Sequence, residues 1–145
     1  MATRLYRNAS LRRIEALNAG APLMQRAGAA AADWAAELAI QRERPVLVLA
    51  GPGNNGGDAF EAARLLRERF FETCVVFAGD PLALPDDAAT ACKRFGDAGG
   101  TIVDTIPDSG RWSLIIDGLF CIGLGRTPAG QYAEEAAQGC QDVVE

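Results

Sequence analysis

Short runs of apolar residues recur along the chain and predict four β-strands. The clearest run is residues 46–50, Val-Leu-Val-Leu-Ala, whose continuous apolar character is typical of a strand buried on both faces. Residues 73–78, 101–106 and 113–116 form three further runs, each bounded by turn-forming or charged residues. We therefore expect four short strands spread along the chain.

Apolar positions at helical spacing predict helices before the first strand. Residues 8–18 form a short helix that Gly20 and Pro22 end, because proline suits a first helical turn but not an interior one. A second helix starts at Pro22, and its apolar face is expected to pack closely on a flat surface. That face comprises Leu23, Ala27, Ala30, Ala31, Trp34 and Leu38, with Gly28 beside it.

Two more helices fall between the predicted strands. Phe60, Ala63, Leu66 and Phe70 recur at helical spacing, and residues 85–98 form a helix ended by two glycines. Strands that alternate with helices pair in parallel, because parallel neighbours need crossover connections that helices normally supply. The predicted fold is therefore α/β, with a three-layer α/β/α, Rossmann-like, mostly parallel sheet.

The sequence predicts one domain over residues 1–145 that is cut within a larger unit. Its 49% hydrophobic composition suits a compact core, and no repeat or linker divides it. Residues 132–145 begin a helix but stop without a C-terminal cap or a following strand. This ending indicates truncation at the C-terminus.

Charge and composition exclude several classes of function. The net charge of −5 and the absence of a large basic cluster argue against nucleic acid, whose phosphates require a basic face. No stretch of about 18 apolar residues is present to span a membrane. Four cysteines without a Cys-x-x-Cys pair, and no histidine, exclude a zinc site and a thiol–imidazole pair. We expect a soluble, cytoplasmic protein whose acid–base chemistry depends on carboxylates.

Residues 51–58, Gly-Pro-Gly-Asn-Asn-Gly-Gly-Asp, lie directly between the first predicted strand and a helix. Backbone amides of such a loop and the positive helix end bind phosphate, which favours nucleotide binding over a simple glycine turn. A carboxylate beside a pyrophosphate is repulsive, so Asp58 and the two asparagines indicate a hard cation with oxygen ligands. The structural alternative for Asp58 is the N-cap of the following helix.

A second glycine-rich segment, residues 118–127, follows Asp117 at the carboxyl end of the fourth predicted strand. The carboxyl ends of strands form the ligand crevice of open α/β sheets, so Asp117 and residues 51–58 are expected to share one site. A strand-end cap is the structural alternative for Asp117. Glycines that let the backbone approach a ligand favour the functional interpretation.

Three segments together resemble the YjeF N-terminal domain family, the NAD(P)H-hydrate epimerases. They are residues 23–28, residues 51–58, and residues 116–120 with Gly123 and Leu124. They occur in the same order as in the family. The asparagine pair in residues 51–58 is the specific part of the resemblance. The resemblance implies an isomerase in nicotinamide nucleotide repair, which interconverts the R and S hydrates of NADH or NADPH at the nicotinamide C6.

The resemblance also implies a ligand set. A potassium ion would be held by Asn55 and Asp117. The implied substrate contacts are Asn54, Asn55, Gly56, Gly57, Asp58, Cys121, Ile122, Gly123, Leu124, Gly125, Arg126 and Thr127. Asp117 is the first candidate for the group that moves the proton when water leaves the hydrate carbon and returns, and Asp58 is the second.

The chain departs from the family pattern at three positions and at its end. Ala59 stands where the family usually has a third glycine, and Gly118 and Cys121 stand where it usually has alanine and glycine. The family continues into an Asp-Ile-Pro-Ser-Gly-like segment with further substrate and potassium ligands, and nothing in residues 1–145 matches it. The resemblance therefore implies a fragment that lacks part of its site and, as cut, part or all of its activity.

Two other functions stay open from the sequence. One is a catalytically silent nucleotide-binding module of a bifunctional protein with a kinase-like dehydratase. The other is an NAD(P)-dependent oxidoreductase, for which Asp80 would be the ribose-binding acid after the second strand. A dehydratase domain, fused or separate, and a second copy of the chain are candidate partners. The sequence does not distinguish NADH hydrate from NADPH hydrate.

Overall fold

A computed structural model describes residues 6–108, 110–120, 130 and 133–134. Within these residues one sheet of four parallel strands has the order β3-β2-β1-β4. The strands are β1 (Val46–Ala50), β2 (Thr73–Val76), β3 (Thr101–Val103) and β4 (Leu114–Gly118). The α/β class and the parallel pairing predicted from the sequence are confirmed.

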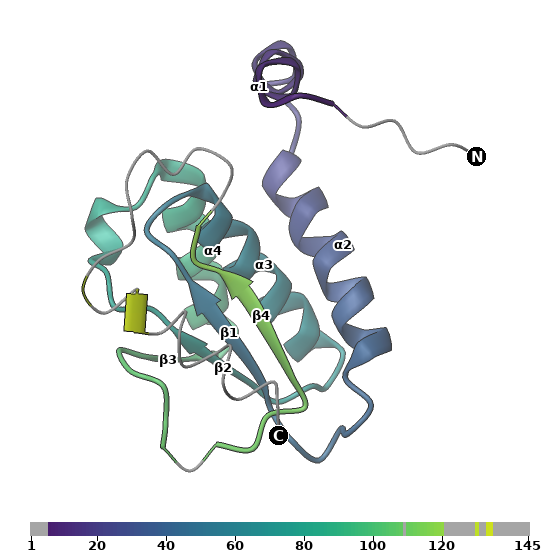
Figure 1. The fold of residues 1–145 in the computed structure, drawn as a ribbon, viewed down its shortest axis with the longest axis vertical. Helices are drawn as coiled ribbons and strands as arrows, with labels where there is room; N and C mark the ends of the chain where they lie inside the picture. The colour runs from purple at the N-terminus through teal and green to yellow at the C-terminus, as the bar shows by residue number, and fades with distance from the viewer. Residues whose placement is uncertain (1–5, 109, 121–129, 131–132, 135–145) are drawn as a thin grey trace.

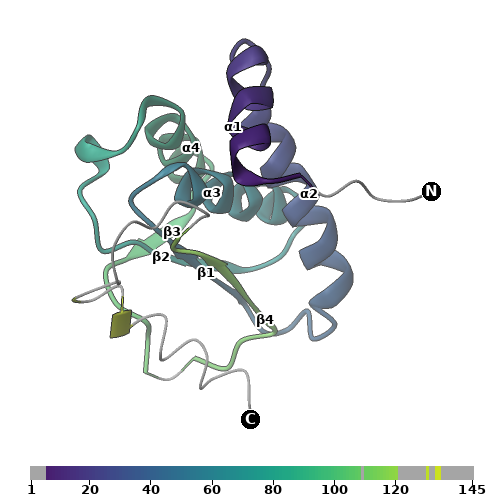
Figure 2. The same cartoon turned by 45° about the horizontal axis from the view of Figure 1, so that its top comes forward.

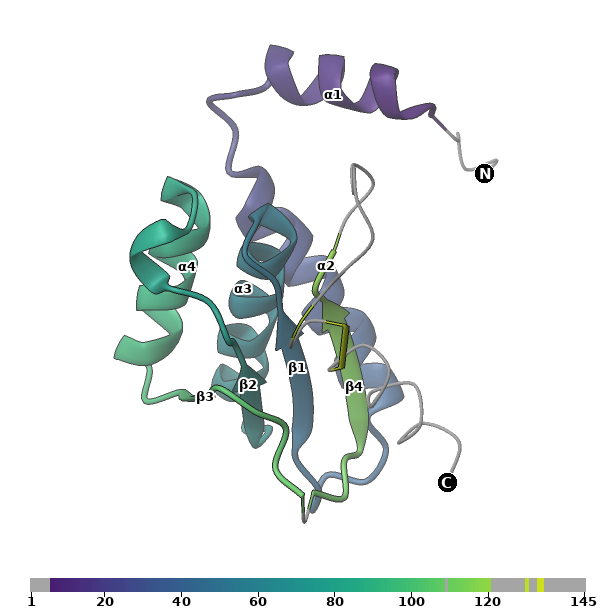
Figure 3. The same cartoon turned by 60° about the vertical axis from the view of Figure 1, so that its left-hand side comes forward.

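Three helices cover one face of this sheet (Figures 1 and 3). They are α2 (Leu23–Leu38), α3 (Asn54–Glu68) and α4 (Asp86–Asp97). α3 is the crossover from β1 to β2, and α4 is the crossover from β2 to β3, preceded by the short 3-10 helix η1 (Pro81–Ala83). Their side-by-side packing leaves α2 at one edge of the helical layer.

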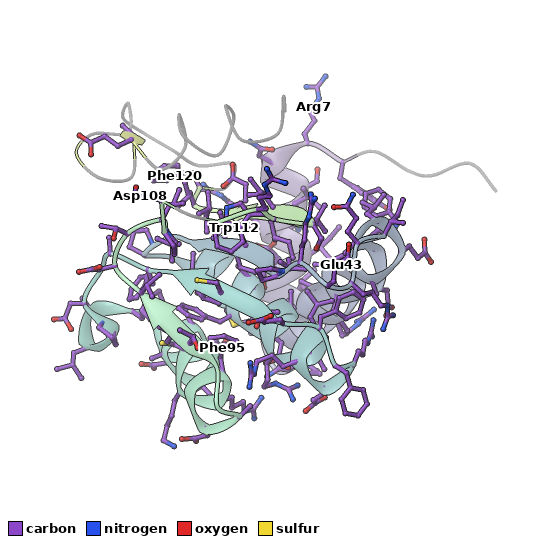
Figure 4. All side chains as sticks on the ribbon, turned by 90° about the horizontal axis from the view of Figure 1, so that it is seen from below. Arg7, Glu43, Phe95, Asp108, Trp112 and Phe120 are labelled. Atoms are coloured by element: carbon purple, nitrogen blue, oxygen red, sulfur yellow. The ribbon has the colours of Figure 1, made fainter. Side chains whose placement is uncertain are left out.

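The sheet buries an apolar cluster on each face. On the helical face, the rings of Phe60 and Phe77 meet edge to face with centroids 5.5 Å apart, and Phe95 packs beside them. On the opposite face, the buried residues are Leu47, Leu49, Val76, Ile106 and Leu119, with Trp112 and Phe120 packed against them. Figure 4 shows Phe95 and Trp112 on opposite sides of the sheet. Every residue of β1 is buried, as its continuous apolar run predicted.

The predicted three-layer fold requires helices on the second face of the sheet as well, opposite α2, α3 and α4. Among the described residues no helix covers it. Two of the predicted three layers are thus described, and the third stays a prediction. The helix predicted from residue 132 onward lies outside the described residues except for residues 133–134.

Two strands are shorter than their apolar runs suggested. β2 ends at Val76 and β3 at Val103, because β3 pairs with β2 alone and over only three residue pairs. One further hydrogen bond, from the Phe77 N–H to the Val103 carbonyl at 2.8 Å, continues the ladder. Ile106 is buried in the second cluster, so its apolar character reflects packing and not strand pairing.

α2 packs with a different face from the one predicted. Its buried residues are Met24, Gly28, Ala32 and Ala35. Trp34, which the spacing placed on the packing face, is 74% exposed. A Cβ atom added at Gly28 would lie 2.6 Å from the Cβ of Glu61 on α3. The small residues are buried because only they let the two helices approach this closely.

α1 (Asn8–Leu17) projects beyond the carboxyl edge of the sheet and buries none of its residues (Figures 1 and 2). The side-chain amide of Asn18 donates to the Ile14 carbonyl at 2.8 Å and ends the helix. Across the described part of the chain, we find no helix with the length and apolar character needed to cross a membrane.

Candidate functional site at the carboxyl edge of the sheet

The strand order reverses direction between β1 and β4. The chain passes outward from β1 to β2 and β3, and then returns to the other side of β1 as β4. Such a reversal in an open α/β sheet leaves a crevice at the carboxyl ends of the two strands, where ligands bind. Both glycine-rich segments leave these two ends, so the fold brings them to the same edge.

The first glycine-rich segment is half loop and half helix. α3 begins at Asn54, so residues 54–58 form its first turn and not the loop expected from their glycines. Gly53 occupies the N-cap position in an extended conformation, without a side-chain cap. The first amides of α3 therefore point out of the helix end, an arrangement that binds anions. The N-cap alternative for Asp58 is wrong, because Asp58 lies inside the helix.

Close backbone contacts join the two segments. The Gly51 N–H donates to the Gly118 carbonyl at 3.0 Å and extends the β1–β4 ladder. A side chain at Gly51 would overlap the Leu119 carbonyl oxygen, and one at Gly56 would overlap the Gly51 carbonyl oxygen. Packing alone therefore requires glycine at these two positions, whatever phosphate binding adds.

Asn55 links α3 to the segment that follows β4. Its Nδ2 donates to the Phe120 carbonyl at 3.1 Å in a partly buried position. The Oδ1 atom of the same side chain is not used by this hydrogen bond and can serve as an oxygen ligand. Asn55 thus holds the two segments together and presents an amide oxygen at their junction.

Asp117 is the second-last residue of β4 and not the residue after the strand. Its backbone pairs with Leu49, and its Oδ1 accepts the Leu119 N–H at 3.0 Å. Side chains alternate along a strand, so Asp117 points to the same face as Ile115, away from the helices, where it is exposed. The strand-end cap considered from the sequence is present, and it occupies one oxygen of the carboxylate.

Asp58 is half-buried on α3 and has a raised pKa. Burial, as the larger cause, and the negative charge of Glu15 raise the pKa of Asp58 from 3.8 to about 6. A carboxyl group that titrates there can donate and accept protons near neutral pH. Glu15 belongs to α1, and no sequence pattern indicated that it lies near this site.

The raised pKa predicts that stability falls as pH rises. The folded state holds the Asp58 proton more tightly than the unfolded state, so the free energy of unfolding should decrease from about pH 4 to about pH 6. Partial exposure of Asp58 should keep this decrease modest. Urea unfolding across this range should show a smaller decrease for Asp58→Asn than for the unmodified protein. Asp97→Asn, an exposed carboxylate at the end of α4, serves as the control. Equal slopes for Asp58→Asn and the unmodified protein would rule the prediction out.

The family follows from comparison with known proteins. Residues 20–142 match the family model described as YjeF-related protein N-terminus. The chain belongs to this family. It is 47% identical over 113 residues to a protein of Bordetella bronchiseptica and 39% identical over 119 residues to one of Rhodobacter capsulatus, both named NAD(P)H-hydrate epimerase. The matches cover 78% and 77% of this chain, and 49% and 56% of the relatives. The chain thus spans about half the length of the curated relatives it matches.

A solved structure supports the fold of this YjeF-type domain. The crystal structure of the yeast protein ynu0 matches 82% of this chain and 54% of its own chain, with a TM-score of 0.66. The two sequences are 19% identical in this match, so the likeness concerns the fold alone.

The family pattern gives a physical meaning to two of the departures from it. A Cβ atom added at Gly118 would lie 2.5 Å from the Cβ of Ala59 on α3. The space between β4 and α3 therefore holds one methyl group. This chain supplies the methyl from the helix, as Ala59. The glycine and alanine that the resemblance implies for the family at these two positions would supply it from the strand. We therefore predict that the two departures compensate each other, which the sequence did not indicate.

The remaining substrate contacts that the resemblance implies, residues 121–127, lie outside the described residues. They are Cys121, Ile122, Gly123, Leu124, Gly125, Arg126 and Thr127. Asp80, the ribose-binding candidate of an oxidoreductase, lies four residues past the end of β2, and its Oδ1 accepts the Leu82 N–H at 2.9 Å. Its carboxylate thus caps η1.

Proposed function

We propose that this protein is an NAD(P)H-hydrate epimerase that interconverts the R and S hydrates of NADH or NADPH. Family membership and the names of the relatives support the activity. The observation in the molecule that carries the proposal is the hydrogen bond from Asn55 to the Phe120 carbonyl at the β1–β4 reversal, at the same edge of the sheet where the strand that carries Asp117 ends. This junction combines the anion-binding end of α3 with carboxylate and amide oxygens, the groups that a dinucleotide with a reactive ring requires.

The chemistry needs one group that moves a proton. The hydrate carbon bears a hydroxyl group and the ring nitrogen, so protonation of the hydroxyl lets the nitrogen lone pair expel water. The C–O bond breaks, and the C6 centre becomes planar and cationic. Water then adds to either face and returns its proton. Asp117 is the first candidate for this proton transfer and for stabilising the cation, and Asp58, with its pKa near 6, is the second.

Potassium is proposed as the bound cation. The oxygen donors at the junction, Oδ1 of Asn55 and the carboxylate of Asp117, suit a hard cation, and nearby carbonyls can complete its shell. A bound potassium ion would supply positive charge that offsets repulsion between the carboxylates and the substrate's pyrophosphate. Within the described ranges, no group of three or more His, Cys, Asp or Glu side chains could hold a metal ion. The proposed potassium site needs no such group, because its ligands are one carboxylate, one amide oxygen and backbone carbonyls.

The assay follows exchange between the two hydrate epimers by chromatography, without any dehydratase. The full-length protein should accelerate the conversion of one purified epimer into the other, with no change in absorbance of reduced nicotinamide. Binding without exchange would favour the silent module, and a change in that absorbance would favour an oxidoreductase. The engagement of Asp80 in capping η1 weighs against the oxidoreductase. A fused or separate dehydratase and a cytoplasmic location stay predictions.

Asn55→Ala tests the potassium proposal. The change removes an oxygen ligand and the hydrogen bond to Phe120, so binding of potassium and of substrate should weaken by roughly tenfold, the worth of a hydrogen bond of about 1–1.5 kcal/mol. Added potassium should partly restore exchange. Potassium titration of the exchange rate gives the measurement.

Asn55→Asp separates the two roles of Asn55. Aspartate keeps an oxygen ligand but cannot donate to the Phe120 carbonyl. If the oxygen binds potassium, Asn55→Asp should reach its maximal exchange rate at a lower potassium concentration than Asn55→Ala does. Equal loss in both variants would limit Asn55 to joining the two segments.

A further inference from the structure

Residues 23–28 carry part of the family resemblance, but they supply no group to the site described above. They form the start of α2, where Met24 and Gly28 are buried. These two residues are four apart and therefore lie on one face of the helix. α2 begins at the end of the helical layer where β1 and β4 finish (Figure 1). Both buried residues contact α3 at this end.

Met24 packs on the first turn of α3, in the space that a side chain at Gly57 would occupy. A Cβ atom added at Gly57 would overlap Cε of Met24 and lie 2.7 Å from its Sδ. The same atom would lie 2.9 Å from Cα of Ala88, in the first turn of α4. Met24 is only 8% exposed, so its thioether end is enclosed where the first turns of α3 and α4 meet α2.

One turn further along both helices the sizes of the partners are reversed. Gly28 of α2 leaves room for Glu61 of α3, which is buried. Arg64 holds the Glu61 carboxylate in place, with Nη2 donating to Oε1 at 2.7 Å and Nε donating to Oε2 at 3.2 Å. A large residue on α2 thus lies over a glycine of α3, and a glycine on α2 lies against a large residue of α3. Because the two contacts differ in size, they fix the position of α3 along α2.

We propose that Met24 is a positioning residue, which holds the first turn of α3 where its amides bind the pyrophosphate of the substrate. The inference rests on the proposed function for the identity of the bound group. The first amides of a helix have no acceptor within the helix, so their direction depends on what holds the turn. Asn55 holds this turn from the side of β4, through the Phe120 carbonyl at 3.1 Å. Met24 holds it from the side of α2 and α4, and its thioether carries no charge for a phosphate, so it acts through the turn.

Met24→Ala in the full-length protein tests this role. ADP-ribose carries the pyrophosphate without the nicotinamide ring, and its affinity, measured by calorimetry, should fall by roughly tenfold because the emptied space lets the turn move. In epimer exchange the KM should rise by a similar factor. The maximal rate should change by about twofold or less, because Asp117 lies on β4 and not on α3. Met24→Leu keeps most of the apolar volume and should recover most of the affinity.

Leu66→Ala is the matched control, since Leu66 is fully buried on α3 but far from its first turn. It should lower the urea midpoint at least as much as Met24→Ala and leave ADP-ribose affinity unchanged. Met24→Val and Leu66→Val form a milder pair with the same expected contrast if the alanine variants do not fold. Unchanged affinity in the Met24 variants, an equal loss in the Leu66 variants, or no binding of ADP-ribose by the unmodified protein would overturn the inference. Weaker ADP-ribose binding by Met24→Ala, together with no epimer exchange by the unmodified protein, would contradict the proposed function alone.

Discussion

Asp117→Asn is expected to fold normally and to exchange the hydrate epimers about 10²–10⁴-fold more slowly than the unmodified protein, the usual worth of a positioned acid or base. Asparagine keeps the oxygen that accepts the Leu119 N–H at 3.0 Å, so the end of β4 should be preserved. It also keeps one oxygen ligand for a cation. It cannot carry a proton between water and the hydrate, so the loss should fall on the rate and leave much of the nucleotide binding intact.

The measurement is epimer exchange by the full-length protein, with nucleotide affinity determined separately. Asp97→Asn provides a matched control, since it removes an exposed carboxylate on α4 and should not alter exchange. Asp58→Asn provides the competing assignment. Near-normal exchange by Asp117→Asn together with slow exchange by Asp58→Asn would move the proton-transfer role to Asp58.

Gly118→Ala is expected to destabilise the protein although alanine is the residue that the family usually has there. The added Cβ would lie 2.5 Å from the Cβ of Ala59 and 3.0 Å from the Leu49 carbonyl oxygen. Overpacking of this kind costs about 1–3 kcal/mol. Urea unfolding at a fixed pH measures the loss as a lower denaturation midpoint.

The double variant Ala59→Gly with Gly118→Ala should recover much of that loss. It moves the single methyl group from α3 to β4, so the space is filled once. Ala59→Gly alone should cost roughly 1 kcal/mol, because glycine disfavours helix and leaves the space empty. A double-mutant cycle measures the coupling between the two sites. Additive losses would show that Ala59 and Gly118 do not compensate each other.

The sequence alone determined most of the elements. The apolar run at residues 46–50 fixed β1 and its burial on both faces, because a strand in the middle of a parallel sheet has no polar side. Helical spacing located α1, α2 and α4 to within a few residues. The asparagine pair within residues 51–58 was the most specific part of the resemblance to the family. All these signals are local.

The sequence predicts the start of α3 too late, because the low helix propensity of its glycines and their packing in the fold favour different conformations. Glycine has a low helix propensity, so residues 54–58 were expected to be loop. In the structure Gly56 lies against the Gly51 carbonyl, where a side chain would overlap that oxygen. The same glycines that disfavour a helix locally are required for the helix to begin this close to β1.

Only the tertiary structure decided which helices and strands contact each other. Two faces of α2 are apolar, and the contact of Gly28 with Glu61 selected the face of small residues for burial. The strand order placed β4 beside β1, and this alone brought Asp117 to the same edge as Asn55 and Gly118 against Ala59. Periodicity reports the neighbours of a residue along its own helix or strand. It carries no information about which element lies across the space that a side chain fills, and that is why these contacts required the fold.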